Sequence, residues 1–194
     1  MRLLMVAPPG AGKGTQAKLL SAHYGIAHIS SGDVFRREVE AGTELGRVVA
    51  EYLARGDLVP DELVLQILTQ PVIEAAGTGG YVLDGFPRSL GQAEEAYKVA
   101  KQVSGIELQA VVHLIVPRAE LLRRLRARAA AEDRGDDDEA IIAHRLDVYD
   151  SETEPMLEFY AGRGLVVDVD GFQPVEAVLA DIVKKVDALR EGLR

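Results

Sequence analysis

Ten residues near the start of the chain have the composition of a loop that binds phosphate. The run Ala7-Pro8-Pro9-Gly10-Ala11-Gly12-Lys13-Gly14-Thr15-Gln16 follows a strand-like apolar segment and leads into a helix-like one. Its three glycines let backbone amides approach an anion closely, and the start of a helix favours negative charge. Lys13 adds a mobile positive charge for the outer phosphates. The run therefore predicts a site for a nucleotide polyphosphate.

This loop departs from the strict phosphate-loop pattern at two positions. The pattern has Gly where this chain has Ala7, and Ser or Thr directly after the lysine, where this chain has Gly14 followed by Thr15. An ordinary glycine-rich turn is the alternative interpretation. The strand before the loop and the helix after it favour the phosphate site, and the amides that would face phosphate begin only at Gly10.

A second polar group follows a buried strand-like run at residues 80–88. Asp84 ends the apolar stretch and Arg88 follows four residues later. A carboxylate at a strand end beside a phosphate loop commonly orders Mg²⁺, directly or through water. The guanidinium of Arg88 offers a planar fork to a phosphate. The alternative for Asp84 is a helix cap or a turn former.

Two further polar segments gain meaning only in combination with these. Residues 30–36 read as a capped helix start with Arg36 on its first turn. A basic block inside an acidic protein comprises Arg118, Arg123, Arg124, Arg126 and Arg128. Its alternative interpretation is a solvated helix face. We expect Arg124 and Arg128 to be functional because they come just before an acidic bridge, and the other three to be surface residues.

The elements that must position these groups alternate between strand and helix. This order predicts an α/β fold, a doubly wound five-stranded parallel sheet covered on both faces. The expected strands are Leu3–Ala7, Ala27–Ile29, Tyr81–Leu83, Ala110–Val116 and Leu165–Val169. The expected core helices are Lys13–Tyr24, Ser89–Val103, Ala119–Ala130, Asp138–Arg163 and Pro174–Arg190. Ligands of such sheets bind beyond the carboxyl ends of the strands, where the polar segments fall.

Two insertions interrupt the alternation. Residues 30–59 hold two short expected helices, Asp33–Glu40 and Glu44–Arg55, and residues 128–138 form a short charged bridge. Between the insertions, a helical pattern over Asp61–Ala76 contains Pro71, which predicts a kink or a break.

Composition narrows the classes of function. The chain has 194 residues and no cysteine, which excludes disulfides, thiol catalysis and cysteine-ligated zinc. A net charge of −9 argues against nucleic acid as a partner. Without an apolar run long enough to span a bilayer or a signal-like start, we expect one cytoplasmic domain and no membrane partner.

Taken together, these segments resemble the adenylate kinase family, and the resemblance covers essentially the whole chain. It also extends to residues 56–62 and to Gln92. It implies a P-loop core of residues 1–29, 60–127 and 139–194, a mobile insertion for the nucleoside monophosphate at 30–59, and a short lid at 128–138. The chain has neither the length nor the cysteines for the zinc-bearing subdomain of long-lid relatives. The resemblance further implies a cis bond between Phe86 and Pro87.

The resemblance also assigns site residues. Those expected to bind ATP are Gly10, Ala11, Gly12, Lys13, Gly14, Thr15, Arg124, Arg128 and Gln173. Those expected to bind AMP are Ser31, Arg36, Asp57, Leu58, Val59, Gly85, Phe86, Pro87, Arg88, Gln92, Arg134 and Arg145. Similar short-lid kinases place two arginines eleven residues apart around an acidic pair, which fits Arg134 and Arg145. The groups expected to act in catalysis are Lys13, Asp84, Arg88, Arg128, Arg134 and Arg145.

The implied activity is the reversible, Mg²⁺-dependent transfer of a phosphoryl group from ATP to AMP, giving two ADP. We expect the protein to be a monomer. We expect Mg²⁺ to be bound by nucleotide phosphates and water, with Asp84 contacting that water and no protein side chain bound directly to the ion. Such a transfer needs clustered positive charge and no general base, because the acceptor is already a phosphate oxygen. The four histidines, His23, His28, His113 and His144, therefore have no evident chemical task.

Three other functions remain in view. A kinase for another nucleoside monophosphate, pyrimidine or guanine, is the nearest alternative, although the amide of Gln92 can both donate to and accept from an adenine edge. A non-catalytic nucleotide sensor has only Ala7 in its favour. A GTP-hydrolysing switch normally recognises guanine through an asparagine, and this chain contains none.

Overall fold

A five-stranded parallel sheet lies at the centre of the computed structural model, which describes residues 1–131 and 139–192. Its strands lie in the order β2-β3-β1-β4-β5, so that β1 and β3, which precede the two predicted site loops, are neighbours. Their bounds are β1 Arg2–Val6, β2 Ala27–Ser30, β3 Tyr81–Asp84, β4 Ala110–Ile115 and β5 Val166–Asp170. The fold class is confirmed, and each strand ends within one residue of its predicted limit.

Helices connect the strands, and two further helices form the insertion at residues 30–59. Their bounds are α1 Lys13–Tyr24, α2 Ser31–Glu40, α3 Glu44–Arg55, α4 Asp61–Gly77, α5 Leu90–Gln102, α6 Arg118–Ala131, α7 Glu139–Val148, α8 Met156–Ala161 and α9 Val175–Gly192. Most lie within two residues of the predicted ranges. No helix in the described part of the chain is long and apolar enough to cross a membrane.

The long helix predicted over 138–163 is wrong as a single element. The structure has α7, then a π-helical turn η1 at Tyr149–Thr153, then α8. The wider π turn shifts the hydrogen-bond pattern, and Pro155 precedes α8, where its missing amide costs nothing. Its apolar residues stay buried across all three pieces, which explains why the sequence reads as one helix.

The break considered at Pro71 does not occur, because α4 continues through this residue. Proline removes one intrahelical hydrogen bond and usually disturbs an interior position. Here Val64 and Leu68 before it and Ala75 after it are all buried. Packing on both sides of Pro71 therefore keeps the helix continuous.

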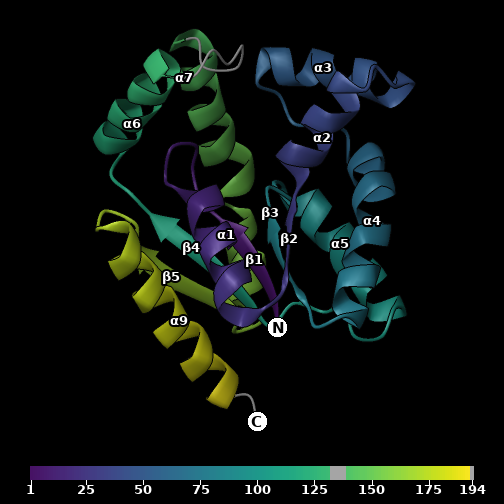
Figure 1. The fold of residues 1–194 in the computed structure, drawn as a ribbon, viewed down its shortest axis with the longest axis vertical. Helices are drawn as coiled ribbons and strands as arrows, with labels where there is room; N and C mark the ends of the chain where they lie inside the picture. Colours follow the sequence, from purple (N-terminus) through teal and green to yellow (C-terminus); the bar gives the residue numbers. More distant parts are fainter. Residues whose placement is uncertain (132–138, 193–194) are drawn as a thin grey trace.

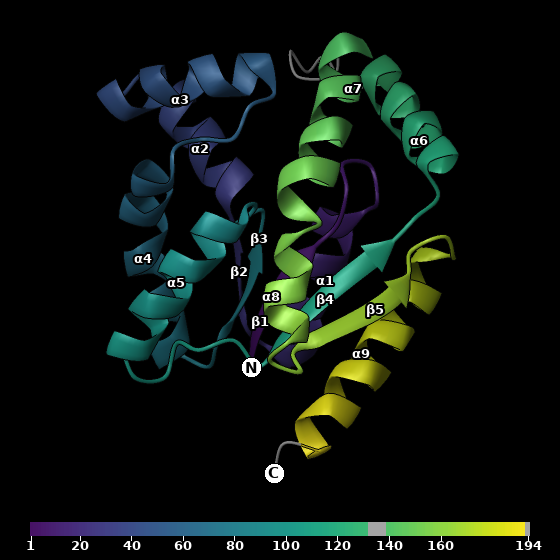
Figure 2. The same ribbon diagram turned by 180° about the vertical axis from the view of Figure 1, so that it is seen from behind.

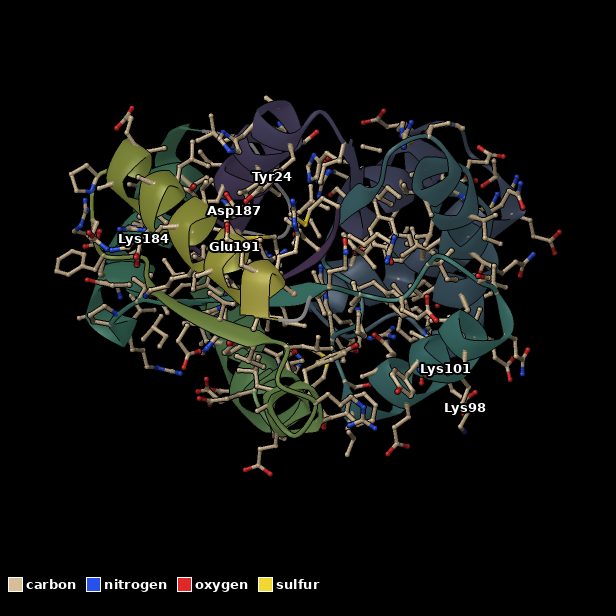
Figure 3. All side chains as sticks on the ribbon, turned by 90° about the horizontal axis from the view of Figure 1, so that it is seen from below. Tyr24, Lys98, Lys101, Lys184, Asp187 and Glu191 are labelled. Carbon is tan, nitrogen blue, oxygen red and sulfur yellow. The ribbon has the colours of Figure 1, made fainter. Side chains whose placement is uncertain are left out.

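The core lies in two layers, one on each face of the sheet. Leu3 and Met5 of β1 pack on the face covered by α1 and α9, whereas Leu4 and Val6 face the side covered by α4, α5 and α8 (Figures 1 and 2). The first layer closes with a hydrogen bond of 3.1 Å from the Tyr24 hydroxyl on α1 to Asp187 on α9 (Figure 3).

The insertion 30–59 and the two helices on either side of the second insertion extend from the same end of the sheet. The pair α2 and α3 follows β2, and the pair α6 and α7 follows β4, and Figure 1 shows the two pairs above the carboxyl ends of the strands. The phosphate loop after β1 and the segment after β3 open toward the same space. The fold thus gathers the predicted site segments at one edge.

Candidate active site

The glycine-rich loop after β1 has the backbone geometry of an anion site. Gly10 and Gly12 have φ of +84° and +88°, which favours glycine, and a Cβ at Gly10 would lie 2.9 Å from Leu125 Cγ. Helix α1 begins at Lys13, and within the described residues no side chain caps that start. The first amides of α1 are therefore open to a ligand. Ala7 is buried and belongs to the hydrophobic core beside the loop.

Lys13 and Asp84 form an ion pair that joins α1 to the end of β3. Asp84 is buried, and its second oxygen lies 3.5 Å from Nε2 of His28 on β2. The helix-cap alternative for Asp84 fails, because its carboxylate contacts Lys13 instead. Burial, followed by the charges of Arg88 and Arg145, lowers the pKa of Lys13.

The segment after Asp84 turns sharply and fixes Arg88. Gly85 has φ +87°, and the bond between Phe86 and Pro87 is cis, which confirms that expectation. Arg88 donates from Nε to the Gly85 carbonyl at 2.7 Å, and its own carbonyl accepts from the Thr153 hydroxyl at 2.6 Å. The guanidinium is thus held in place from both the turn and η1.

Positive charge is concentrated where these segments meet. Burial first, then Arg145 and Arg36, lowers the pKa of Arg88 from 12.5 to about 10. The guanidinium groups of Arg36, Arg88 and Arg145 carry like charges and therefore repel one another. The buried carboxylate of Asp84 pairs with Lys13. Such crowding disfavours the empty site and favours an occupant that carries several negative charges.

Two adjoining pockets share this cluster. The first is lined by the phosphate-loop residues Pro9 and Lys13, and the second by Arg36, the segment 57–59 and Gln92. Residues that line both are Gly56, Leu58, Gly85, Arg88 and Arg145. Arg88 and Arg145 therefore lie at the boundary between the two pockets, although they come from different parts of the chain.

Gln92 is placed in the second pocket but not as an exposed amide. Its side chain is 2% exposed, and its Oε1 accepts from the Arg88 amide at 2.8 Å. Its Nε2 donates to Asp61 Oδ1 at 2.9 Å and to the Val59 carbonyl at 3.5 Å. Gln92 therefore contributes to the fold as well, because the protein already uses both ends of its amide.

Ser31 and Arg36 both lie on α2. Ser31 is fully buried, and its hydroxyl has no hydrogen-bond partner among the residues that the structure describes. It faces the glycine turn, since a Cβ at Gly85 would lie 2.5 Å from Ser31 Oγ. Arg36 pairs with Asp33 at 2.5 Å and remains 45% exposed. Arg36 lines the second pocket, whereas Ser31 lies behind the Gly85 turn.

Asp57 shows a contact that the sequence did not indicate. Its carboxylate accepts from Arg55 Nε and from His144 Nε2, both at 2.8 Å. The pKa of Asp57 is lowered by these hydrogen bonds, that from Arg55 first. His144 lies on α7, so this contact joins the insertion 30–59 to the helix after the predicted lid. Tyr149 and Thr153 of η1 also line the first pocket and were not predicted.

The other residues expected to bind ATP lie on α6 and in the turn between β5 and α9, apart from those of the phosphate loop and α1. Arg124 is half-buried and donates to the carbonyls of Ala11 and Gly171 at 3.4 Å and 3.3 Å, which ties the phosphate loop to the β5–α9 turn. The Gln173 amide donates to the Asp170 carbonyl of its own turn. Arg128 lies half-buried on α6, and Arg134 lies outside the described residues.

The sequence also led to expectations for the first turn of α1 and for the rest of the basic block. Gly14 and Thr15 lie on α1 next to Lys13, with Thr15 exposed. The expectation of surface positions is confirmed for Arg118, Arg123 and Arg126, whose side chains are 50%, 69% and 63% exposed.

Comparisons with known proteins agree with this geometry. The sequence profile of one family, described as Adenylate kinase, matches residues 5–165. A protein named adenylate kinase from Thermobifida fusca is 44% identical over 92% of this chain and 94% of its own length. A protein of the same name from Nocardioides sp. is 42% identical over 99% of this chain and all of its own length. One from Leptospira biflexa is 40% identical over 95% of this chain and 99% of its own length.

Proposed function

Because the chain belongs to the adenylate kinase family, we propose that its two adjoining pockets hold the two nucleotides of that family's reaction. The reaction is the reversible transfer of a phosphoryl group from ATP to AMP. The pocket beside the phosphate loop takes the donor, and the pocket lined by Arg36 and Gln92 takes the acceptor. Among residues 1–131 and 139–192 we find no feature that favours another nucleoside monophosphate.

The position of Arg88 and Arg145 carries this assignment. Both line the two pockets at once, so they reach the place where the phosphates of the two nucleotides meet. Transfer spreads negative charge over the equatorial oxygens of the moving group, and fixed cations there stabilise it more than they stabilise the separate substrates. Lys13 lines the donor pocket and stabilises the charge of the same phosphoryl group from the side of ATP.

The other residues take supporting roles in this proposal. The amides of residues 10–15 hold the donor phosphates, and Arg124, Arg128 and Gln173 support the donor side. Ser31, Arg36, residues 57–59 and the turn 85–88 hold AMP, with Arg134 closing from the lid. We propose the insertion 30–59 and the lid 128–138 as the two parts that move over the core, because closure excludes water, which could otherwise accept the phosphoryl group.

The residues present fit a magnesium ion that is held mainly by the nucleotides. The described residues contain no cluster of three or more metal-ligating side chains, and the buried Asp84 is the carboxylate at the site. Mg²⁺ commonly keeps several waters and binds through phosphates and one or two carboxylates. When bound, it would neutralise charge on the phosphates, while Asp84 would orient its water and hold Lys13.

A coupled assay with ATP, Mg²⁺ and one of AMP, CMP, UMP or GMP tests the proposal. We expect AMP to have the highest kcat/KM and the reaction to stop when the divalent ion is chelated. A higher kcat/KM for CMP, UMP or GMP would contradict the acceptor assignment. A cytoplasmic location and a monomeric state stay predictions, and sedimentation of the purified chain tests the second.

A further inference from the structure

A cavity separate from the nucleotide pockets lies on the other side of the Phe86-Pro87 turn. It has a volume of about 260 Å³ and is enclosed by α4, α5, α8 and the β3 strand. Its inner wall is formed by the buried apolar side chains of Leu68, Leu83 and Phe86. Engineered apolar cavities of about 150 Å³ bind benzene, so this space admits a larger apolar body.

The rim of the cavity differs in chemistry from its wall. Lys101 of α5 and Arg163, which follows α8, both line the opening and both lie over the ring of Tyr97, at 5.2 Å and 4.8 Å from its centre. Arg163 also lies 3.6 Å from the centre of the Phe159 ring. The two cations therefore contact the same ring at the cavity, although they come from different elements.

These two cations also lack an acidic partner. Within the described residues, neither Lys101 nor Arg163 forms an ion pair, whereas Lys98, one turn earlier on α5, pairs with Glu95 at 2.5 Å. Glu107 is the one carboxylate among the residues that line the cavity, so cations outnumber anions there. This local excess of positive charge contrasts with the net charge of −9 of the whole chain.

We propose that this cavity binds a small amphiphilic carboxylate, with its apolar body against Leu68 and Leu83 and its carboxylate between Lys101 and Arg163. An uncharged apolar ligand would leave the two cations without an anion. A purely ionic ligand would leave the apolar space unused. A medium-chain free fatty acid satisfies both parts of the site.

The experiment measures binding of decanoate to the full chain by isothermal titration calorimetry, with saturating AMP and below the concentration at which decanoate forms micelles. We expect one site per chain, and weaker binding of decan-1-ol, which lacks the charge. Lys101→Gln and Arg163→Gln should each weaken decanoate binding about tenfold, the usual effect of losing one charged hydrogen bond. Both residues are exposed, so each change should lower the melting temperature by no more than about 2–4 °C, through the loss of exposed cation–π contacts.

Lys98→Gln is the matched control, because Figure 3 shows Lys98 and Lys101 on the same helix and Lys98 does not line the cavity. It should leave decanoate affinity unchanged. Ala100→Leu, which fills the space from α5, should abolish binding while ADP formation persists. The proposal is overturned if decanoate does not bind, if decan-1-ol binds equally well, if Lys98→Gln acts as strongly as Lys101→Gln, or if AMP displaces decanoate.

The outcome is independent of the proposed kinase function. Binding is read as heat, without turnover, so a chain that fails the nucleotide assay can still show the carboxylate site. Equally, a chain that phosphorylates AMP and ignores decanoate would remove only this inference.

Discussion

At the residue scale, Gln92, which we propose as part of the acceptor site, also stabilises the fold. Both ends of its amide bond to the protein, to the Arg88 amide on one side and to Asp61 on the other. We therefore propose that Gln92 acts on the acceptor by holding the chain around Arg88. The sequence indicated its place in the site, but its burial depends on α5 packing against the segment before α4.

We predict that Gln92→Ala lowers stability as well as affinity for AMP. It leaves a buried amide and a carboxylate without partners, which costs about 1–3 kcal/mol. For a chain of this size that corresponds to a fall in melting temperature of about 2–4 °C per kcal/mol. Calorimetry and the KM for AMP measure the two effects. Gln102→Ala, on the exposed end of the same helix, is the control, and equal effects of both changes would contradict this role.

Gly85 gives a sharper test, because a matched glycine exists elsewhere in the chain. Gly85 and Gly105 have nearly the same φ, +87° and +88°. A Cβ at Gly85 would lie 2.5 Å from Ser31 Oγ and 2.9 Å from Arg88 Nη2, whereas a Cβ at Gly105 would meet nothing within 4 Å. Both positions therefore carry the same backbone strain, but only one lies against the site.

We predict that Gly105→Ala loses about 1–2 kcal/mol of stability, the cost of alanine in the left-handed region, and that Gly85→Ala loses more because its Cβ also meets Ser31 and Arg88. Only Gly85→Ala should also lower kcat/KM for AMP, by at least tenfold, because it displaces Arg88. Thermal unfolding and steady-state kinetics on both variants separate the two effects. Normal kinetics in Gly85→Ala would show that the turn does not control Arg88.

At the element scale, the sequence predicts the sheet well and the segment after the lid poorly. Buried apolar runs end at glycine, proline or aspartate, so strand limits can be read from local chemistry. The apolar pattern of residues 139–161 continues through η1, and nothing local shows that the helix widens there. The convergence of Arg145 with Arg88 likewise depends on how α7 crosses the strand ends, which spacing along the chain does not contain.

The π-helical turn has a consequence for the site, because it brings the Thr153 hydroxyl to the Arg88 carbonyl at 2.6 Å. Thr153 is then a positioning residue for Arg88. We predict that Thr153→Val, which keeps the shape and removes the hydroxyl, lowers kcat about fivefold to tenfold, the value of one hydrogen bond of about 1 kcal/mol or slightly more. Thr153→Ser should restore kcat. A purely structural role of this hydrogen bond would instead lower the melting temperature of Thr153→Val and leave its kcat unchanged.

At the scale of the whole molecule, the structure combines an acidic chain with a crowded positive site. The pKa of Arg88 is lowered to about 10, below its ordinary value of 12.5, mainly by burial and then by Arg145 and Arg36. For a base, a lowered folded-state pKa means that the charged form is disfavoured by folding. Its charge therefore opposes folding at all pH values below about 10, and this opposition is relieved only above that pH or by a bound anion.

This linkage makes stability a measure of the site. We predict that Arg88→Gln leaves the melting temperature of the nucleotide-free protein unchanged or raises it, because it removes a charge that opposes folding. With ADP and Mg²⁺ at a hundred times the dissociation constant, the wild-type chain should gain about 2.7 kcal/mol, or about 5–11 °C. The same nucleotide concentration should raise the melting temperature of Arg88→Gln by only a small part of that amount.

Arg118→Gln is the control for this comparison, since Arg118 is exposed and pairs with Asp147 and Asp150 away from both pockets. It should show the full nucleotide-dependent rise and wild-type turnover, while Arg88→Gln loses about a hundredfold in kcat. If Arg88→Gln instead lowers the melting temperature of the nucleotide-free protein as much as it reduces the nucleotide effect, Arg88 serves the fold and not the phosphates. The two roles predict different melting temperatures for nucleotide-free Arg88→Gln. One thermal scan of that sample therefore shows whether the charge of Arg88 serves phosphate binding or the stability of the fold.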